Sequence, residues 1–189
     1  MKKILVCLMA LIAAAFSLGA QNSSEIISKI EKAYANPKTV ETAFSEIYSS
    51  FDTSVPQKKR NGKLTYKAGV IRMDYSNGDL FLVDGNRMTI NNGSAKQVFD
   101  LTKNIMMKEL SNTLNYAFQG QLTKLATEQN ADITATKDGN FYLITLTARK
   151  KAPRGYSKIV AYYRVSDCLI NSMRMDEFNG ASTFYTVAK

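Results

Sequence analysis

The chain has 189 residues, of which 45% are hydrophobic and 22% are charged, and its formal net charge is +9. It contains no histidine, which excludes Ser-His-Asp and Cys-His catalytic sets and removes the commonest zinc ligand. The length suits one domain with a sizeable core, and the positive charge favours anionic partners.

The first twenty residues have the form of a bacterial secretory signal peptide. A basic start, Met1-Lys2-Lys3, precedes an apolar run from Ile4 to Phe16 and a small-residue exit over 17–20. The run is too short to span a membrane, which needs about 20 apolar residues. We expect cleavage near Ala20, a periplasmic location and a single mature domain over 21–189. Its net charge falls from +9 to +7 with the loss of Lys2 and Lys3.

Residues 22–35 are predicted to form a helix. Apolar residues recur at helical spacing from Ile26 through Ile30 to Tyr34. Asn22 can cap the start of this helix. Pro37 ends it, because the residue before a proline avoids the helical conformation.

From Val40 the apolar residues recur at every second position, which is the period of a strand. Asn77-Gly78, Asp84-Gly85 and Asn92-Gly93 are strong hairpin signals between the strands. The pattern therefore predicts an antiparallel meander. Its expected strands are 42–48, 63–67, 70–75, 79–83, 87–90 and 97–100.

The strand period stops between Met106 and Glu128, where we expect one or two short helices with Gly120 as a break. Many sequential antiparallel strands twist and curl into a sheet with a concave face. The helices can cover that face. The second group of expected strands is 132–136, 141–148, 158–164, 169–177 and 182–187.

The two cysteines allow no intramolecular disulfide in the mature chain, because Cys7 lies in the signal peptide. Cys168 follows Asp167 beside an expected strand. We interpret it as a small buried hydrophobe in preference to a reactive thiol.

Two dense basic runs, Lys58-Lys59-Arg60 and Arg149-Lys150-Lys151, fall at expected hairpin tips. The plain interpretation is a solvated positive surface. Export argues against a nucleic-acid partner. The net charge is expected to steer the protein toward acidic faces of a membrane complex, at rates that fall with salt.

Three short motifs are more specific than the strand pattern: Gly62–Tyr66 (GKLTY), Val70–Tyr75 (VIRMDY) and Leu82–Asn86 (LVDGN). Weaker matches follow in the expected order, among them Phe44 with Glu46 and the segment from Asp176 to Gly180. Behind a signal peptide, this order resembles the periplasmic carriers of outer-membrane lipoproteins, the LolA family.

The resemblance implies a mostly β fold with a few α-helices, an unclosed antiparallel β-barrel (half-barrel) covered by a helical lid. It also implies a soluble, monomeric protein that is no enzyme and holds neither a cofactor nor a metal. Such a carrier binds lipoprotein acyl chains in an apolar cavity. It receives them from an inner-membrane ABC-transporter release complex and passes them to an outer-membrane acceptor.

The chain departs from the family at the turn after the first motif, where the family often holds Arg-Pro and links that arginine to lid closure. Residues 67–69 here are Lys-Ala-Gly. Arg72 and Lys67 are the candidates for the lid contact. Alternatively, Arg72 pairs with Asp74 or Glu46 at the surface, contributing at most about 1 kcal/mol.

An acyl-chain cavity requires apolar area hidden from water, at about 25 cal/mol per Å², and a lining that repacks easily, as methionine does. The alternative is that the same residues fill a dry core. The candidates from the sheet are Leu64, Tyr66, Ile71, Met73, Leu80, Leu82, Met88 and Ile90, and those from the helices are Ile26, Ile30, Leu114, Phe118 and Leu122.

Two other functions compete with a carrier. The first is a regulatory or scaffolding module on the same fold, which senses envelope lipids or proteins without transporting them. The second is a hydrolase that uses carboxylates, which the lack of histidine and of an evident acid pair disfavours.

Overall fold

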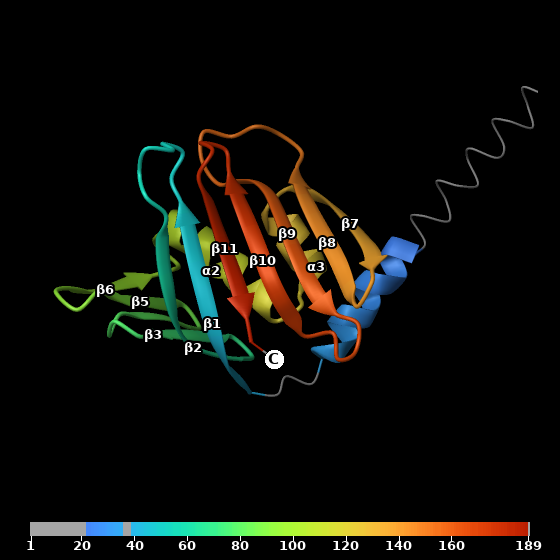
Figure 1. Cartoon of the computed structure of the whole chain (residues 1–189), viewed down its shortest axis with the longest axis horizontal. Coiled ribbons are helices and arrows are strands. Elements are labelled where there is room, and N and C mark those ends of the chain that lie inside the picture. The colour runs from blue at the N-terminus through green and yellow to red at the C-terminus, as the bar shows by residue number, and fades with distance from the viewer. Residues whose placement is uncertain (1–21, 36–38, 189) are drawn as a thin grey trace, which may run out of the picture.

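Eleven antiparallel strands form one sheet in the computed structural model, which describes residues 22–35 and 39–188 (Figure 1). The predicted signal peptide lies outside the described residues. The strands are β1 (Val40–Ser49), β2 (Lys58–Lys67), β3 (Val70–Tyr75), β4 (Leu80–Asp84), β5 (Arg87–Asn91), β6 (Lys96–Asp100), β7 (Ala131–Asp138), β8 (Phe141–Ala148), β9 (Tyr156–Arg164), β10 (Ile170–Glu177) and β11 (Ser182–Val187).

The strand order is β6-β5-β4-β3-β2-β1-β11-β10-β9-β8-β7. Two meanders, β1–β6 and β7–β11, are therefore joined only where β1 pairs with β11, from Phe44 opposite Val187 to Ser49 opposite Ser182. β6 and β7 are the two ends of this order and do not pair with each other. The predicted fold class, an unclosed antiparallel half-barrel with helices, is confirmed.

The helices lie on one side of the sheet. α2 (Ile105–Phe118) and α3 (Leu122–Glu128) follow the edge strand β6 and lead to the opposite edge strand β7, so they run behind the strands in Figure 1. A further helix over residues 22–33 lies beside β7 and β8. None of the helices in the described ranges is long and apolar enough to cross a membrane.

The N-terminal helix is fastened to the sheet by polar bonds from two of its turns and from the residue that follows it. Ser23 Oγ accepts the amide of Ala135 in the edge strand β7 at 2.8 Å, which blocks part of an exposed edge. Lys29 donates to the Tyr142 hydroxyl at 2.8 Å. Tyr34, just past the helix, accepts the Ile170 amide through its hydroxyl at 3.0 Å.

β2 begins at Lys58, in a stretch that the sequence analysis expected to be a polar loop. The four residues before Gly62 pair with the second half of β1, from Tyr48 opposite Lys58 to Ser45 opposite Asn61. The strand continues there because Arg60 faces Glu46 across the ladder and forms an ion pair with it. Residues 58–61 are polar and all exposed, so the sequence shows no alternation of polarity that would indicate a strand there.

Gly120 separates α2 from α3, as predicted, and has a positive φ of 59°. A Cβ at this position would lie 2.3 Å from a ring carbon of Tyr34. The Tyr34 ring is held by its hydroxyl bond to Ile170, so it cannot simply move aside. The junction of α2 and α3 thus requires a residue without a side chain.

We expect G120A to lower the free energy of unfolding by about 3 kcal/mol, since it adds a steric clash to the cost of a left-handed alanine. Gly85 is the matched control, because it has a φ of 56° and open space around its Cβ position. G85A should cost only about 1 kcal/mol. Urea denaturation measures both values, and equal losses would show that the Tyr34 contact is unimportant.

Candidate functional site

The inner face of the sheet and the buried sides of the helices form one apolar cluster. Most of the residues predicted to line a cavity meet in this cluster, and Ile90 packs against it half-buried. The cluster members among them are Ile26, Ile30, Leu64, Tyr66, Ile71, Met73, Met88, Leu114, Phe118 and Leu122.

Leu82 lies on the outer face of the sheet, so the expected orientation of β4 is wrong there, whereas Leu80 at the start of the strand lines the smaller hollow described below. Phe81 and Val83 are the buried residues of this strand. The register shows the reason, because Leu82 lies opposite Arg72 whereas Phe81 lies opposite the buried Met73. All four β4 side chains are apolar, so alternation of polarity could not choose the inner face.

The larger hollow has a volume of about 810 Å³ and lies where the N-terminal helix, the β2–β3 turn and the α2–α3 junction meet. Tyr34 and Tyr66 give it an apolar wall, and Gln119 adds an amide. Charged residues of both signs, among them Glu31 and Lys67, also line it. This combination suits a molecule with an apolar body and a polar end.

The smaller hollow has a volume of about 210 Å³ and lies between α2 and strands β3 to β5. It is lined by apolar side chains from the sheet, such as Phe81 and Ile90, and from α2, such as Leu110. Arg60 and Tyr75 also line it. The two hollows thus lie at different ends of the interior, with the buried cluster between them.

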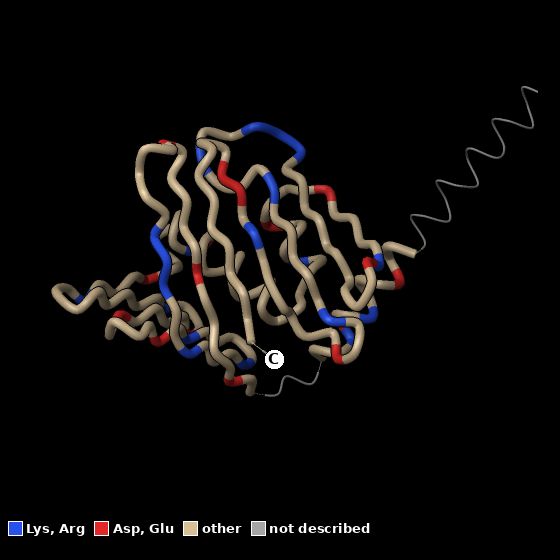
Figure 2. Tube along the Cα trace, in the orientation of Figure 1, with Lys and Arg blue, Asp and Glu red and all other residues tan. Residues whose placement is uncertain are grey.

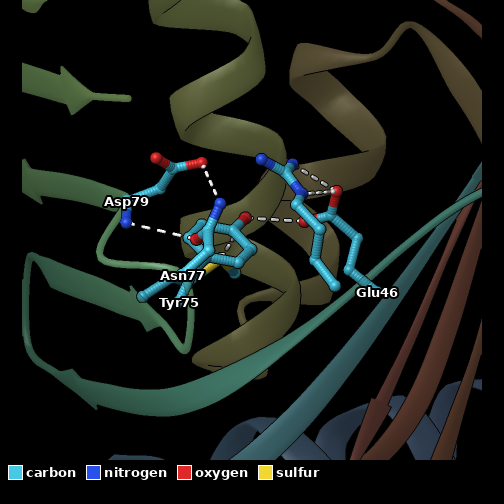
Figure 3. A network of polar contacts seen from close by, with 6 residues as sticks. Glu46, Tyr75, Asn77 and Asp79 are labelled. Carbon is cyan, nitrogen blue, oxygen red and sulfur yellow. Dashed lines mark hydrogen bonds and ion pairs between the residues drawn. The ribbon is translucent and has the colours of Figure 1, made fainter. Parts of the chain in front are cut away.

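A buried carboxylate interrupts the apolar inner face beside the smaller hollow (Figure 3). Glu46 of β1 is 3% exposed and forms an ion pair with Arg60 of β2. Its second oxygen accepts a hydrogen bond from the Tyr75 hydroxyl at 2.6 Å. The Arg60 guanidinium also stacks over the Tyr75 ring, 4.2 Å from its centre, so three strands are tied together by one polar network.

An aromatic ring flanks the buried side of the network. Phe44 meets Tyr75 edge to face, with 5.2 Å between ring centres. Burial, followed by the nearby Glu46 charge, raises the pKa of Tyr75 and of Tyr185 well above the ordinary value. In the next turn, Asn77 donates to the Asp79 carboxylate at 2.8 Å (Figure 3), which fixes the rim of the smaller hollow.

This network was not predicted from the sequence. The only signal was Glu46 two residues after Phe44, which puts a carboxylate on the same face as a core aromatic residue. Nothing in the sequence linked it to Arg60, because residues 58–61 were not expected to be a strand. Tyr185 lies in the final strand, far from both in the sequence.

Of the two roles considered for Arg72, the surface pair is found and the lid contact is not. Arg72 lies on the outer face and makes two hydrogen bonds of 2.7 Å to Asp74, which is the alternative pairing considered above. Lys67 is exposed and lines the larger hollow. The contact from this turn to the helices is instead made by the Gly69 amide, which donates to the Gln119 side chain at 3.3 Å.

A second bond joins the helices to the sheet near the same point. The Tyr163 hydroxyl of β9 donates to the carbonyl of Ala117 in α2 at 2.7 Å. In addition, Glu31 of the N-terminal helix accepts the Thr123 amide at the start of α3 at 2.8 Å. These bonds hold the C-terminal end of α2 and the α2–α3 junction against the rest of the molecule.

Cys168 is buried, as expected, and burial raises the pKa of its thiol, so it has no activated thiolate character. In the part of the chain that the structure describes, no group of three or more acidic or cysteine side chains is placed to hold a metal ion.

No family model matches the sequence, and a search of curated proteins finds no relative. Among solved structures, the chain is similar to a LolA superfamily protein from Nitrosomonas europaea, with a TM-score of 0.42, 9% identity, and coverage of 89% of this chain and 92% of that one. It is also similar to the lipoprotein LppX from Mycobacterium tuberculosis, with a TM-score of 0.45, 12% identity, and coverage of 88% and 94%.

A third likeness is to the complex of MucA and MucB from Pseudomonas aeruginosa, with a TM-score of 0.47 and 11% identity. The match covers 87% of this chain and 54% of that one. These likenesses concern the path of the chain alone.

Removal of the Arg60 charge should be costly, because it leaves Glu46 buried without a cation. We expect R60M to lower the free energy of unfolding by about 3 kcal/mol. The double variant R60M/E46Q should recover most of this loss, since glutamine keeps the size and still accepts the Tyr75 bond. Chemical denaturation of the two variants tests this, and equal losses would contradict the role given to the ion pair.

Stability should fall at alkaline pH. Burial raises the pKa of Tyr34, Tyr75, Tyr156, Tyr163 and Tyr185 above the ordinary value of 10. The unfolded chain releases these protons near pH 10 while the folded chain keeps them, so the contribution of these tyrosines to the free energy of unfolding is constant below that pH and decreases above it. Denaturation at stepwise pH, with tyrosinate absorbance as the second readout, measures the decrease. Constant stability up to pH 11 would contradict it.

Proposed function

We propose that this protein is an exported, non-enzymatic carrier that binds the acyl chains of lipoproteins between its sheet and its helices. The observation that carries the proposal is the interior itself. In the described part of the chain, the helices cover an apolar concave face; a hollow of about 810 Å³ lies at the margin of this cover and one of about 210 Å³ lies beneath α2.

The size of the larger hollow supports binding of a lipid-sized guest. Sites for small molecules and cofactors usually occupy about 300–1,000 Å³. The buried cluster between the hollows consists of side chains alone, so a long acyl chain that reached from one hollow to the other would displace some of them.

The composition of the inner face supports such displacement. Met73, Met88, Met173 and Met175 are all buried on inner strand positions. Methionine is unbranched and flexible, so it repacks around guests of varied shape at small cost. A transported chain needs this adaptability, because it has to be released again.

The helices are held in a way that permits opening. The hydrogen bonds from α2 to the sheet and turn come from its C-terminal end, at Ala117 and Gln119. At its other end Ile105 is 73% exposed and Met106 is 51% exposed. An apolar chain could approach between the start of α2 and the neighbouring edge of the sheet, and α2 would swing about the α2–α3 junction.

The complete proposal is a periplasmic shuttle from an inner-membrane ABC-transporter release complex to an outer-membrane acceptor. The predicted signal peptide supports export, and the resemblance of the sequence motifs to lipoprotein carriers supports the route. The positive charge would speed encounters with acidic partner faces. No chemical step is needed, because the guest is moved without being altered.

A regulatory or scaffolding module is the second candidate, and the largely filled interior favours it. Side chains such as Tyr163, Phe118 and Ile144 are fully buried and already occupy the centre. Depletion in the native cell separates the two functions. If the protein is a carrier, lipoproteins remain at the inner membrane after depletion. If it is a sensor, depletion changes signalling alone.

Adjacent positions on β5 offer a test of binding. Ile90 faces the smaller hollow and Thr89, opposite Leu82, faces outward, while both are half-buried. We expect I90K to weaken uptake of a fluorescent fatty acid at least about tenfold, since an ammonium group beside an acyl chain is costly to desolvate. T89K places the same charge on the outer face and should bind normally.

Mass spectrometry of lipid retained after gentle purification from the native envelope provides the independent measurement. The native protein and T89K should retain lipid, and I90K should retain less. Thermal melting confirms that both variants are folded. Absence of retained lipid together with no uptake of the fluorescent fatty acid by the native protein would rule out the carrier function.

A further inference from the structure

Three loops meet at one end of the sheet, which we call the loop end: residues 50–57 between β1 and β2, 149–155 between β8 and β9, and 178–181 between β10 and β11. The register places them together, because Ser49 pairs with Ser182 and Glu177 pairs with Tyr156. The Phe178 amide also donates to the Gly155 carbonyl at 3.2 Å.

The loop end presents apolar side chains to solvent. Phe51 is 67% exposed and Val55 is 42% exposed, both in the loop that projects beyond β1 and β2 (Figure 1). The loop is itself ordered by local bonds, since Asp52 accepts both the amide and the hydroxyl of Ser54. The aromatic side chain of Phe51 is thus presented to solvent by an ordered loop.

Cations surround these apolar residues. Figure 2 shows a basic stretch along the β8–β9 loop and another at the start of β2. Arg149 pairs with Asp132 at 2.8 Å, and the acids Asp52 and Glu177 also lie at this end, so the net positive charge comes from the remaining cations. They are the exposed residues Lys58, Lys59, Lys150, Lys151 and Arg154.

We propose that the loop end docks on an anionic lipid bilayer. Exposed aromatic and aliphatic side chains with lysine and arginine around them are the composition of surfaces that lie in a membrane interface. Phe51 and Val55 enter the headgroup region, where aromatic rings are favoured. The surrounding cations contact anionic headgroups, and each adds to the attraction.

The shape of the loop end favours a bilayer over an acidic protein. The apolar residues project on a convex loop, whereas a protein partner would require a pocket complementary to Phe51. Four of the five cations are long, flexible lysines, spread over the start of β2 and the β8–β9 loop, which suits mobile lipid headgroups better than fixed carboxylates.

Docking at this end would also shorten the path of a guest molecule. Arg60 and Tyr75, which line the smaller hollow, lie at the end of β2 and β3 nearest the loop end. A lipid that leaves the bilayer would therefore meet this hollow first. The docking itself does not depend on uptake of a guest, so it can be tested separately from the carrier function.

The test is co-sedimentation of the purified protein with two kinds of vesicle. We expect binding to phosphatidylcholine vesicles in which about a third of the lipid is phosphatidylglycerol, and little binding to phosphatidylcholine alone. Binding should weaken when salt rises from about 0.05 M to about 0.5 M. Failure to bind the anionic vesicles at low salt would overturn the proposal.

Matched variants locate the contact. K150Q/K151Q should weaken binding to the anionic vesicles by roughly fivefold for each cation removed. R87Q/K137Q removes the same charge from exposed positions beside the turns at the opposite end and should leave binding nearly unchanged. Equal losses in the two double variants would show that only net charge matters and would overturn the assignment to the loop end.

F51S tests the apolar contribution. It removes an exposed ring, so folding should be unaffected, and it should weaken vesicle binding about fivefold or more. Unchanged binding would overturn insertion of Phe51. I90K separates this proposal from the carrier function, because a docking surface should bind vesicles normally in that variant, whereas association driven by guest uptake would be lost.

Discussion

The chain has to cross from one edge of the sheet to the other between β6 and β7, and this crossing determines the rest of the molecule. A strand order that begins with β6 and ends with β7 leaves the intervening residues only two routes, over the convex or the concave face. The segment contains the apolar stripe of α2, with Leu114 and Phe118 on it, so it takes the concave route and buries that stripe against the strands. The order of the strands along the chain thus itself requires α2 and α3 to lie over the interior.

A cover of this kind is stable without being rigid. Apolar burial holds α2 and α3 in place, and such burial is non-directional, so the helices can shift while remaining in contact with the sheet. Directional bonds are concentrated at Ala117, Gln119 and Thr123, around the bend at Gly120. One end of the cover is therefore fixed, and the other is held mainly by packing. The arrangement reconciles a well-packed interior with passage of a guest.

The inner face combines two kinds of cohesion. Most of it is apolar and adaptable, but the Glu46–Arg60–Tyr75 network fixes β1, β2 and β3 to one another through charge and hydrogen bonding. Buried ion pairs contribute little net stability compared with apolar residues of the same shape, yet they are costly to break. A network of this kind defines one position where the sheet stays in register while the neighbouring methionines rearrange.

The turns, the strand order within each meander and the helical break at Gly120 were readable from the sequence, because each depends on local signals such as Asn-Gly pairs and apolar period. The pairing that joins the two meanders could not be read from the sequence, since no local signal in β1 identifies β11 as its partner. The same limit applied to the site. Leu64, Met73 and Phe118 were identified by alternation or helical spacing, whereas the face of β4 was misassigned because Leu80 to Val83 are uniformly apolar.

The pairing of Phe44 with Val187 has a consequence for the synthesis of the protein. β1 emerges early and lacks one of its neighbours until β11 has followed, so for most of chain production an apolar strand edge is unprotected. Contacts between residues so distant in sequence form slowly, and unpaired edges aggregate. A molecule with this topology benefits from a chaperone that shields the nascent chain until the two halves can join.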